Sequence, residues 1–194
     1  MVIYDFDLVL TSEDTFTNFI EWHSGEVKTT LARALLSPIS FVGSVIGDEV
    51  LWKDNMLGMH FEKMTEEEFN KICKRYAIIK LPEIIIQDGI RSIKQHIQDQ
   101  GEICIVSSGF TKYVETYFKQ LNVKVIGSSI NCDNEHPMMQ LNCNYEEKLN
   151  AVKSVYNLQE YERVIVYGRS PESDGLMSIA TDRFYDPYEP EYPD

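Results

Sequence analysis

The sequence predicts an α/β fold in which helices cover both faces of a mainly parallel sheet. Short β-branched runs, at 102–106, 123–126 and 163–167, alternate with amphipathic segments of helical spacing. Continuous apolar strands of this kind are typical of parallel sheets that are buried on both faces. The chain has 194 residues, 43% hydrophobic and 25% charged, which indicates a globular protein of about one domain and excludes a disordered or fibrous chain.

The balance of charge limits the partners of this chain. It carries 18 Lys and Arg residues against 31 Asp and Glu residues, a formal net charge of -13. Such a field repels nucleic acids and anionic lipid surfaces, so we expect no nucleic-acid partner. A small anionic substrate stays open, because a cleft is governed by its own few charges and by any bound cation.

The cysteines and the first residues indicate a cytoplasmic protein. Four cysteines are spaced too widely for a metal or redox motif, which predicts free thiols in a reducing compartment. The chain begins MVIYDFD, with two acids and no basic segment before an apolar stretch, so no secretory signal is predicted.

The first half of the chain is predicted to be a strand followed by helices. Val2 to Tyr4 forms a short strand, and Ser12 to Thr15 has the residues of a helix start. Apolar residues then fall at helical spacing as far as Ala77. The clearest signal is Thr65, three residues before Glu68, because this pair can form a capping box; it predicts a helix over 66–76.

The second half alternates helices and strands. Helices are predicted at 84–97, 111–121 and 145–156, between strands at 102–106, 123–126 and 163–167. Residues 130–144 suggest a hairpin or an irregular excursion. The last ten residues, YDPYEPEYPD, contain three prolines and four acids and are predicted to form an extended tail.

One window, from Leu31 to Ile46, is the most apolar part of the chain. It is short for a membrane span and contains Arg33, Pro38 and Gly43, so no stable membrane span is predicted. We interpret it as a buried helix pair. The alternative is a helix that dips into a bilayer or receives a lipid tail.

Polar residues that could do chemistry follow the predicted strands. Asp5 and Asp7 come after the first strand, Ser107 after the second, and Lys148 lies at the start of a later helix. Ligands of parallel sheets bind beyond the carboxyl ends of the strands, so these side chains are expected to meet. Two acids, a hydroxyl and a lysine suit phosphoryl transfer, in which one carboxylate accepts the phosphoryl group and the other moves protons.

The order of these residues resembles the haloacid dehalogenase superfamily of phosphohydrolases over nearly the whole chain. DFDLVLTSEDTF resembles the family's first motif, IVSSGF the second, NCNYEEKLNAV the third, and VYGRSPESDGLM lies where the family has its metal-binding fourth motif. The resemblance implies that Asp5 is the nucleophile and Asp7 the acid/base. It also implies that Ser107, Ser108, Gly109 and Lys148 bind phosphate.

The wording of the motifs is closest to the phosphoserine-phosphatase-like branch, whose members carry a helical cap. The resemblance therefore implies a Rossmann-like core at 1–15 and 80–194, with a helical cap at 16–79 and the acidic tail at 185–194. It implies Mg²⁺ as cofactor, held by Asp5, Asp7 and Asp174. The expected substrate is a small phosphate monoester, and the apolar window raises lipid phosphates or other apolar esters as candidates.

Two positions depart from the family pattern. Arg169 stands where the family has Asp or Asn, and a guanidinium has no lone pair for a metal. Asp174 or Glu172 could supply the missing oxygen, although Asp174 could equally cap a helix; alternatively, Arg169 could pair with Asp5 and Asp7 in place of Mg²⁺. Leu8 stands where the family has glycine and adds bulk beside the reaction centre.

Three functions remain open from the sequence. The first is a Mg²⁺-dependent phosphatase acting through an aspartyl phosphate on Asp5. The second is a degenerate family member that binds a phosphate ligand with little catalysis, which Arg169 suggests. The third is a structural protein whose acidic tail at 185–194 meets a basic partner.

Overall fold

The computed structural model describes residues 1–46, 50–131, 137–169 and 173–188, with only the backbone described for 37–46 and 50. Its centre is a six-stranded sheet in the order β4-β3-β2-β1-β5-β6. Neighbouring strands are parallel except β3 and β4, which form an antiparallel pair. The strands are β1 (Val2–Asp5), β2 (Ile103–Phe110), β3 (Lys124–Asn131), β4 (Met138–Leu141), β5 (Ile165–Gly168) and β6 (Asp182–Tyr185). The predicted α/β class is confirmed.

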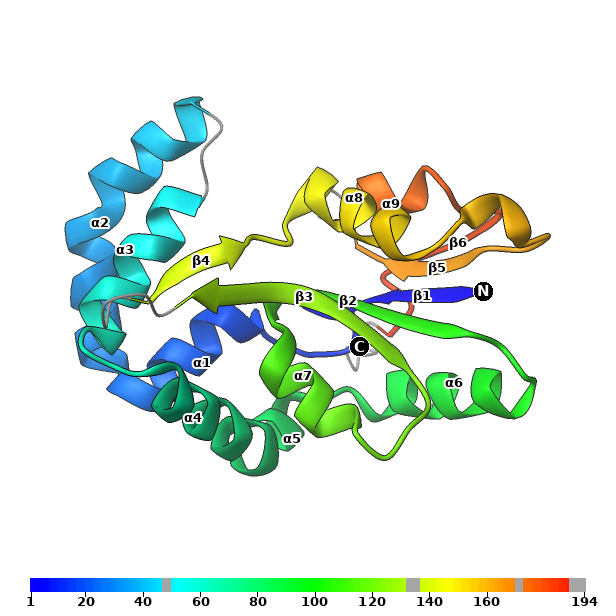
Figure 1. Ribbon diagram of the computed structural model, residues 1–194, viewed down its shortest axis with the longest axis horizontal. Helices are drawn as coiled ribbons and strands as arrows, with labels where there is room; N and C mark the ends of the chain where they lie inside the picture. The colour runs from blue at the N-terminus through cyan, green and yellow to red at the C-terminus, as the bar shows by residue number, and fades with distance from the viewer. Residues whose placement is uncertain (47–49, 132–136, 170–172, 189–194) are drawn as a thin grey trace, which may run out of the picture.

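Helices cover both faces of the sheet, as Figure 1 shows. Helices α6 (Gln87–Gln98) and α7 (Thr111–Phe118) lie on one face, and α8 (Tyr145–Val155) and α9 (Asp174–Met177) on the other. Successive side chains of a strand point to opposite faces. Tyr4 therefore shares a cluster with Ile93 of α6, whereas Ile3 shares the second cluster with Val152 of α8. The near-continuous apolar run of β1 is explained by this burial on both sides.

The helices between β1 and α6, except for the short last one, gather near the carboxyl ends of the strands, at the left of Figure 1. They are α1 (Thr15–Ser24), α2 (Glu26–Ile46), α3 (Val50–Phe61), α4 (Glu66–Ile79) and α5 (Leu81–Ile84), and a short 3₁₀ turn, η2 (Leu158–Glu160), precedes β5. The capping box predicted for α4 is present, because Thr65 and Glu68 exchange side-chain and backbone hydrogen bonds. The helical content predicted for 16–79 is confirmed, and its role as a separate cap stays a prediction.

The prediction of a buried helix pair in the apolar window is wrong. The backbone runs through 26–46 as one helix, α2, rather than as a helix pair. One side of its first half is exposed: Val27, Leu31 and Leu35 are 75%, 60% and 70% exposed. These residues recur every four positions and form one outward stripe, while Ala32 and Leu36 face the core. Among the described residues, no helix is long and apolar enough to cross a membrane.

Several predicted boundaries moved. The helix predicted at 84–97 is α6 and begins three residues later, because Ile84 is the last residue of the short helix α5. Helix α1 is capped by Asp14, whose side chain accepts a hydrogen bond from the Thr17 N–H. The strand predicted at 123–126 continues to Asn131 as part of a β3–β4 hairpin. Residues 182–185 pair with β5 as an edge strand, so the extended tail begins later than predicted. Its residues 189–194 lie outside the described part of the chain.

Candidate active site

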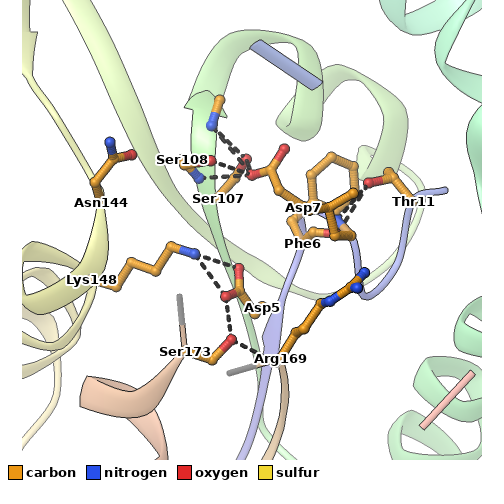
Figure 2. Close-up of polar contacts among 12 residues, drawn as sticks. Asp5, Phe6, Asp7, Thr11, Ser107, Ser108, Asn144, Lys148, Arg169 and Ser173 are labelled. Carbon is orange, nitrogen blue, oxygen red and sulfur yellow. Dashed lines mark hydrogen bonds and ion pairs between the residues drawn. The ribbon is translucent and has the colours of Figure 1, made fainter. Parts of the chain in front are cut away.

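Four segments far apart in the sequence bring polar side chains together at the carboxyl edge of the sheet (Figure 2). Asp5 is the last residue of β1, and Ser107 lies in the neighbouring strand β2. Lys148 projects from the first turns of α8, and Ser173 directly precedes α9. Parallel strands end at the same edge, so the predicted convergence of Asp5, Asp7, Ser107 and Lys148 is what the topology produces.

Asp5 is fully buried and held from two sides. Lys148 Nζ lies 2.8 and 2.7 Å from its two carboxylate oxygens. Ser173 Oγ donates a third hydrogen bond to Oδ2 at 2.6 Å. Lys148 is itself 2% exposed, so this is a buried ion pair with a hydroxyl donor that fixes the carboxylate plane.

The titration of this pair follows from its burial. Burial raises the pKa of Asp5, and the charge and hydrogen bonds of Lys148 oppose that rise. Burial would lower the pKa of Lys148, but the nearby charges of Asp5 and Asp7 outweigh it and raise that pKa. The lysine therefore stays protonated at neutral pH beside a poorly solvated carboxylate.

Asp7 turns away from Asp5 toward the end of β2. Its Oδ2 accepts hydrogen bonds from Ser107 Oγ at 2.8 Å and from the backbone N and Oγ of Ser108 at 2.8 and 2.9 Å. A longer bond of 3.4 Å comes from the Gly109 N–H. On its other oxygen, Oδ1, it accepts from both the backbone N–H, at 3.0 Å, and the hydroxyl of Thr15. Six donors therefore converge on one carboxylate.

These donors define an anion-binding loop, formed by Ser107, Ser108 and Gly109. Hydroxyl and backbone N–H groups that point at one position bind carboxylate and phosphate oxygens alike. Burial acts to raise the pKa of Asp7, but the Lys148 charge and the hydrogen bonds from Thr15 and Ser107 lower it overall. Asp7 is thus an ionised carboxylate in the place where a phosphoryl oxygen could be bound.

Glycine is required at position 109 because the backbone there is tightly enclosed. A Cβ on Gly109 would collide with the Tyr113 hydroxyl and would lie 2.5 Å from Thr15 Oγ1. These two hydroxyls are themselves hydrogen-bonded at 2.8 Å. The loop is therefore held against α1 and α7, which is how a strand end becomes a rigid binding loop.

Leu8 occupies a backbone conformation that favours glycine. Its φ is 62°, in the left-handed region that L-residues with a Cβ avoid. Its N–H donates to Thr11 Oγ1 at 3.1 Å, which helps to hold the turn between Asp7 and α1. The structure thus gives a conformational reason for the glycine of the family pattern and shows that this chain keeps the turn without it.

Arg169 does not take the role of a cation beside Asp5 and Asp7. Its guanidinium forms an ion pair with Asp186 instead, with Nε 3.4 Å from Oδ1, and both side chains are partly exposed. Its backbone N–H donates to Ser173 Oγ at 2.8 Å, so this residue supports the serine through its main chain. The alternative of a guanidinium that replaces a metal between the two acids is wrong in this conformation.

The described residues do not form a three-carboxylate magnesium site. Asp5 and Asp7 are present, but Asp174 is exposed as the first residue of α9, and the preceding Ser173 is the side chain that contacts Asp5. Within the described part of the chain, no three His, Cys, Asp or Glu side chains gather in a group that could hold a metal ion. Asp174 as a ligand stays a prediction, and Glu172 lies outside the described residues.

Three contributors were not predicted from the sequence. Ser173 and Thr15 donate to Asp5 and Asp7, and Lys53 of α3 donates to the Ser108 carbonyl at 2.9 Å. Thr15 lies within the first motif segment, so its proximity to Asp7 could have been inferred from that motif. Ser173 and Lys53 carry no such signal, because serines before helices and lysines on helices are usually solvated.

A mainly parallel sheet with carboxylates, hydroxyls and a lysine at its carboxyl edge is an arrangement found in α/β hydrolases. The chain belongs to the haloacid dehalogenase-like hydrolases, whose family model matches residues 2–174. The resemblance proposed from the four motifs is therefore confirmed. No curated protein matched the chain.

Solved structures share the fold at low sequence identity. A protein of unknown function from Bordetella pertussis Tohama I superposes with a TM-score of 0.75 at 12% identity, covering 94% of this chain and 87% of that one. A phosphoserine phosphohydrolase-like protein from Francisella tularensis subsp. tularensis SCHU S4 has a TM-score of 0.64 at 15% identity, covering 94% and 84%. A phospho-aspartyl intermediate analogue of phosphoserine phosphatase has a TM-score of 0.57 at 13% identity, covering 94% and 83%.

Proposed function

We propose that this protein is a phosphatase that hydrolyses a small phosphate monoester through an aspartyl phosphate on Asp5. One observation carries the proposal: a buried carboxylate paired with Lys148 lies beside a loop whose donors already bind an anion, the carboxylate of Asp7. The similarity to a phosphatase structure with a phospho-aspartyl analogue supports the same chemistry.

In the first half of the reaction, an oxygen of Asp5 attacks phosphorus and the bond from phosphorus to the ester oxygen breaks. Lys148 offsets the repulsion between this carboxylate and the phosphate dianion. The anion-binding loop holds the phosphoryl oxygens once Asp7 has left it. On leaving the loop, the Asp7 carboxylate loses the hydrogen bonds that lower its pKa and takes up a proton from solvent, which it then gives to the departing alkoxide.

In the second half, Asp7 accepts a proton from a water molecule as that water attacks phosphorus. The bond between Asp5 and phosphorus then breaks, which restores the carboxylate and releases inorganic phosphate. Asp7 holds this proton at the end of the hydrolysis and releases it to solvent when its carboxylate returns to the anion-binding loop. Lys148 and the loop donors act in both halves, because both transition states carry charge on the same phosphoryl oxygens.

The proposed substrate is a small phosphate ester, with phosphoserine and apolar or lipid phosphates as the two candidate classes. The exposed stripe of Val27, Leu31 and Leu35 lies on α2. This helix contains the apolar window that suggested apolar or lipid phosphates as substrates. The family resemblance implies a Mg²⁺ requirement, but the described donors do not complete such a site. The test therefore measures turnover both with and without Mg²⁺.

The test is phosphate release from an aryl phosphate, with and without Mg²⁺, by the parent protein and Asp5→Asn. We expect turnover by the parent and none by Asp5→Asn, because the amide is a poor nucleophile. Asp99→Asn serves as the matched control, because Asp99 is an exposed acid at the C-terminal end of α6. Equal turnover by the parent and Asp5→Asn would refute the assignment of the nucleophile.

A second candidate is a protein that binds a phosphate ester with little turnover. It is favoured by Arg169 and Ser173, which place no carboxylate where the fourth motif meets Asp5. In this case calorimetry would detect phosphate binding by a parent that releases no phosphate. The double variant Arg169→Asp/Ser173→Asp would then gain Mg²⁺-dependent turnover; a double variant as inactive as the parent would count against this reading.

A further inference from the structure

We propose that Lys53 is a positioning residue that aims the Gly109 N–H of the anion-binding loop at the bound phosphate. This inference rests on the proposed phosphate site and adds to it a cation from α3, outside the four motifs. Lys53 is 5% exposed, which is unusual for a lysine and indicates that its ammonium group is placed by the structure.

The ammonium group of Lys53 joins three segments around the site. Its Nζ donates to the Ser108 carbonyl at 2.9 Å, to Asn142 Oδ1 at 3.0 Å and to Asn144 Oδ1 at 2.9 Å. Its acceptors therefore lie in the anion-binding loop, at the carboxyl end of β2, and in the segment that leads into α8. An ammonium has three protons, so one side chain can donate to acceptors on both segments at once.

One of these contacts determines the direction of a backbone N–H. The Ser108 carbonyl accepts from Lys53 on α3 and from Ser128 Oγ at 2.8 Å on β3. A trans peptide is planar, so its carbonyl and N–H point in opposite directions. Holding this carbonyl toward Lys53 and Ser128 turns the Gly109 N–H to the other side, toward Asp7 Oδ2 at 3.4 Å and Ser107 Oγ at 3.0 Å.

A second contact joins Lys53 to the helix that carries Lys148. Asn144 is the residue before α8, a position where an asparagine commonly caps the helix, yet it makes no side-chain cap hydrogen bond here. Its side-chain oxygen accepts from Lys53 instead. Figure 2 shows Asn144 on the same side of the site as Lys148. Lys53 therefore connects both groups that would hold the phosphoryl oxygens, the loop and α8.

Asp54, the residue after Lys53, strengthens the attachment of α3 to the sheet. Asp54 Oδ1 accepts from the Met139 N–H at 2.6 Å, which fixes α3 to the exposed edge of β4. The Lys53 ammonium also lies 5.0 Å from the centre of the Phe16 ring, a cation–π distance. Docking of α3 on the sheet and the shape of the anion-binding loop are thus coupled through one side chain.

The experiment measures two properties of the full chain that do not require turnover. The first is calorimetric binding of inorganic phosphate, and the second is hydrogen exchange of the peptides that contain Gly109 and Asn144. The variants are Lys53→Met and Lys53→Gln. Lys53→Gln tests the same loss of charge with a polar side chain if Lys53→Met does not fold. Lys53→Arg retains the charge, and Lys71→Met is the control, because Lys71 is an exposed lysine of α4.

We expect Lys53→Met and Lys53→Gln to bind phosphate at least about tenfold more weakly, the loss expected when one donor to an anion is misdirected. Exchange should accelerate at both peptides but not in α6. Lys53→Arg should recover part of the affinity, and Lys71→Met should equal the parent.

Unchanged affinity and exchange in Lys53→Met would overturn the inference, as would faster exchange throughout the chain, which would indicate a merely structural lysine. If the parent binds no phosphate, the proposed function fails on its own. The exchange comparison then still decides the role of Lys53, since local acceleration at Gly109 supports it and no acceleration refutes it.

Discussion

Replacement of Asp7 by asparagine should make the site bind inorganic phosphate more tightly while it abolishes turnover. In the ligand-free chain the Asp7 carboxylate accepts from Ser107, Ser108 and Gly109, the donors that we assign to phosphate. Phosphate must therefore displace an internal anion before it can bind. Asparagine removes the charge, so this competition weakens.

The structure sets the size of the effect. Three loop donors lie 2.8 to 2.9 Å from Asp7 Oδ2, two of them from Ser108. A hydrogen bond to a charged group exceeds a neutral one by about 1 kcal/mol, so the three together amount to about 3 kcal/mol. Because each 1.4 kcal/mol is tenfold in affinity, the ceiling is about a hundredfold and we expect at least about tenfold.

The assay is calorimetric titration of inorganic phosphate into the parent, Asp7→Asn and Asp14→Asn. Asp14 is the matched control, because its carboxylate caps α1 through the Thr17 N–H at 2.8 Å and does not contact the loop. A gain in both variants would indicate only the loss of a nearby negative charge. Unchanged or weaker binding by Asp7→Asn would refute the idea that Asp7 occupies the phosphate position.

Three further predictions concern stability. Lys148→Met should lower the free energy of unfolding at pH 7 by about 3–5 kcal/mol, because it leaves the Asp5 charge buried without its partner. In urea titrations the double variant Asp5→Asn/Lys148→Met should recover most of this lost stability. Equal instability of the single and double variants would contradict the ion pair. Leu8→Gly should raise the melting temperature by relieving the left-handed φ, a gain of up to about 1 kcal/mol that Leu8→Ala should not reproduce. Burial, with smaller effects from Lys28 and His23, lowers the pKa of His60 to about 4, so the unfolded state binds more protons between about pH 4 and pH 6.5. Stability should therefore rise with pH there, by on the order of 1 kcal/mol from pH 5 to pH 7. His60→Leu should flatten that dependence in thermal melts, and an unchanged slope would show that another group is responsible.

Much of the site could be located before the structure because a parallel sheet gathers strand ends at one edge. Asp5, Asp7 and Ser107 are found there for that topological reason, and Lys148 joins them because α8 packs on the sheet beside them. The capping box of α4 was equally accessible, since its two residues lie three apart on one helix turn.

The fourth motif shows where sequence spacing is insufficient. An offset of one residue exchanges Asp174 for Ser173 as the side chain that meets Asp5, and loop spacing does not fix that offset. The packing does: a Cβ on Gly168 would lie 2.5 Å from the Ser173 Cβ, so glycine at the end of β5 lets the serine approach the site.

By itself, the sequence determined the alternation of strands and helices, the family and the acids at the first strand end, because these depend on local periodicity and on residues close together in the chain. Only the tertiary structure decided that Arg169 turns to Asp186, that the first half of α2 exposes its apolar stripe, and that Lys53 reaches the anion-binding loop at the end of β2. Each of these depends on which segments from distant parts of the chain lie side by side. Hydrophobic periodicity describes one element at a time, and a long-range contact depends on how two elements pack.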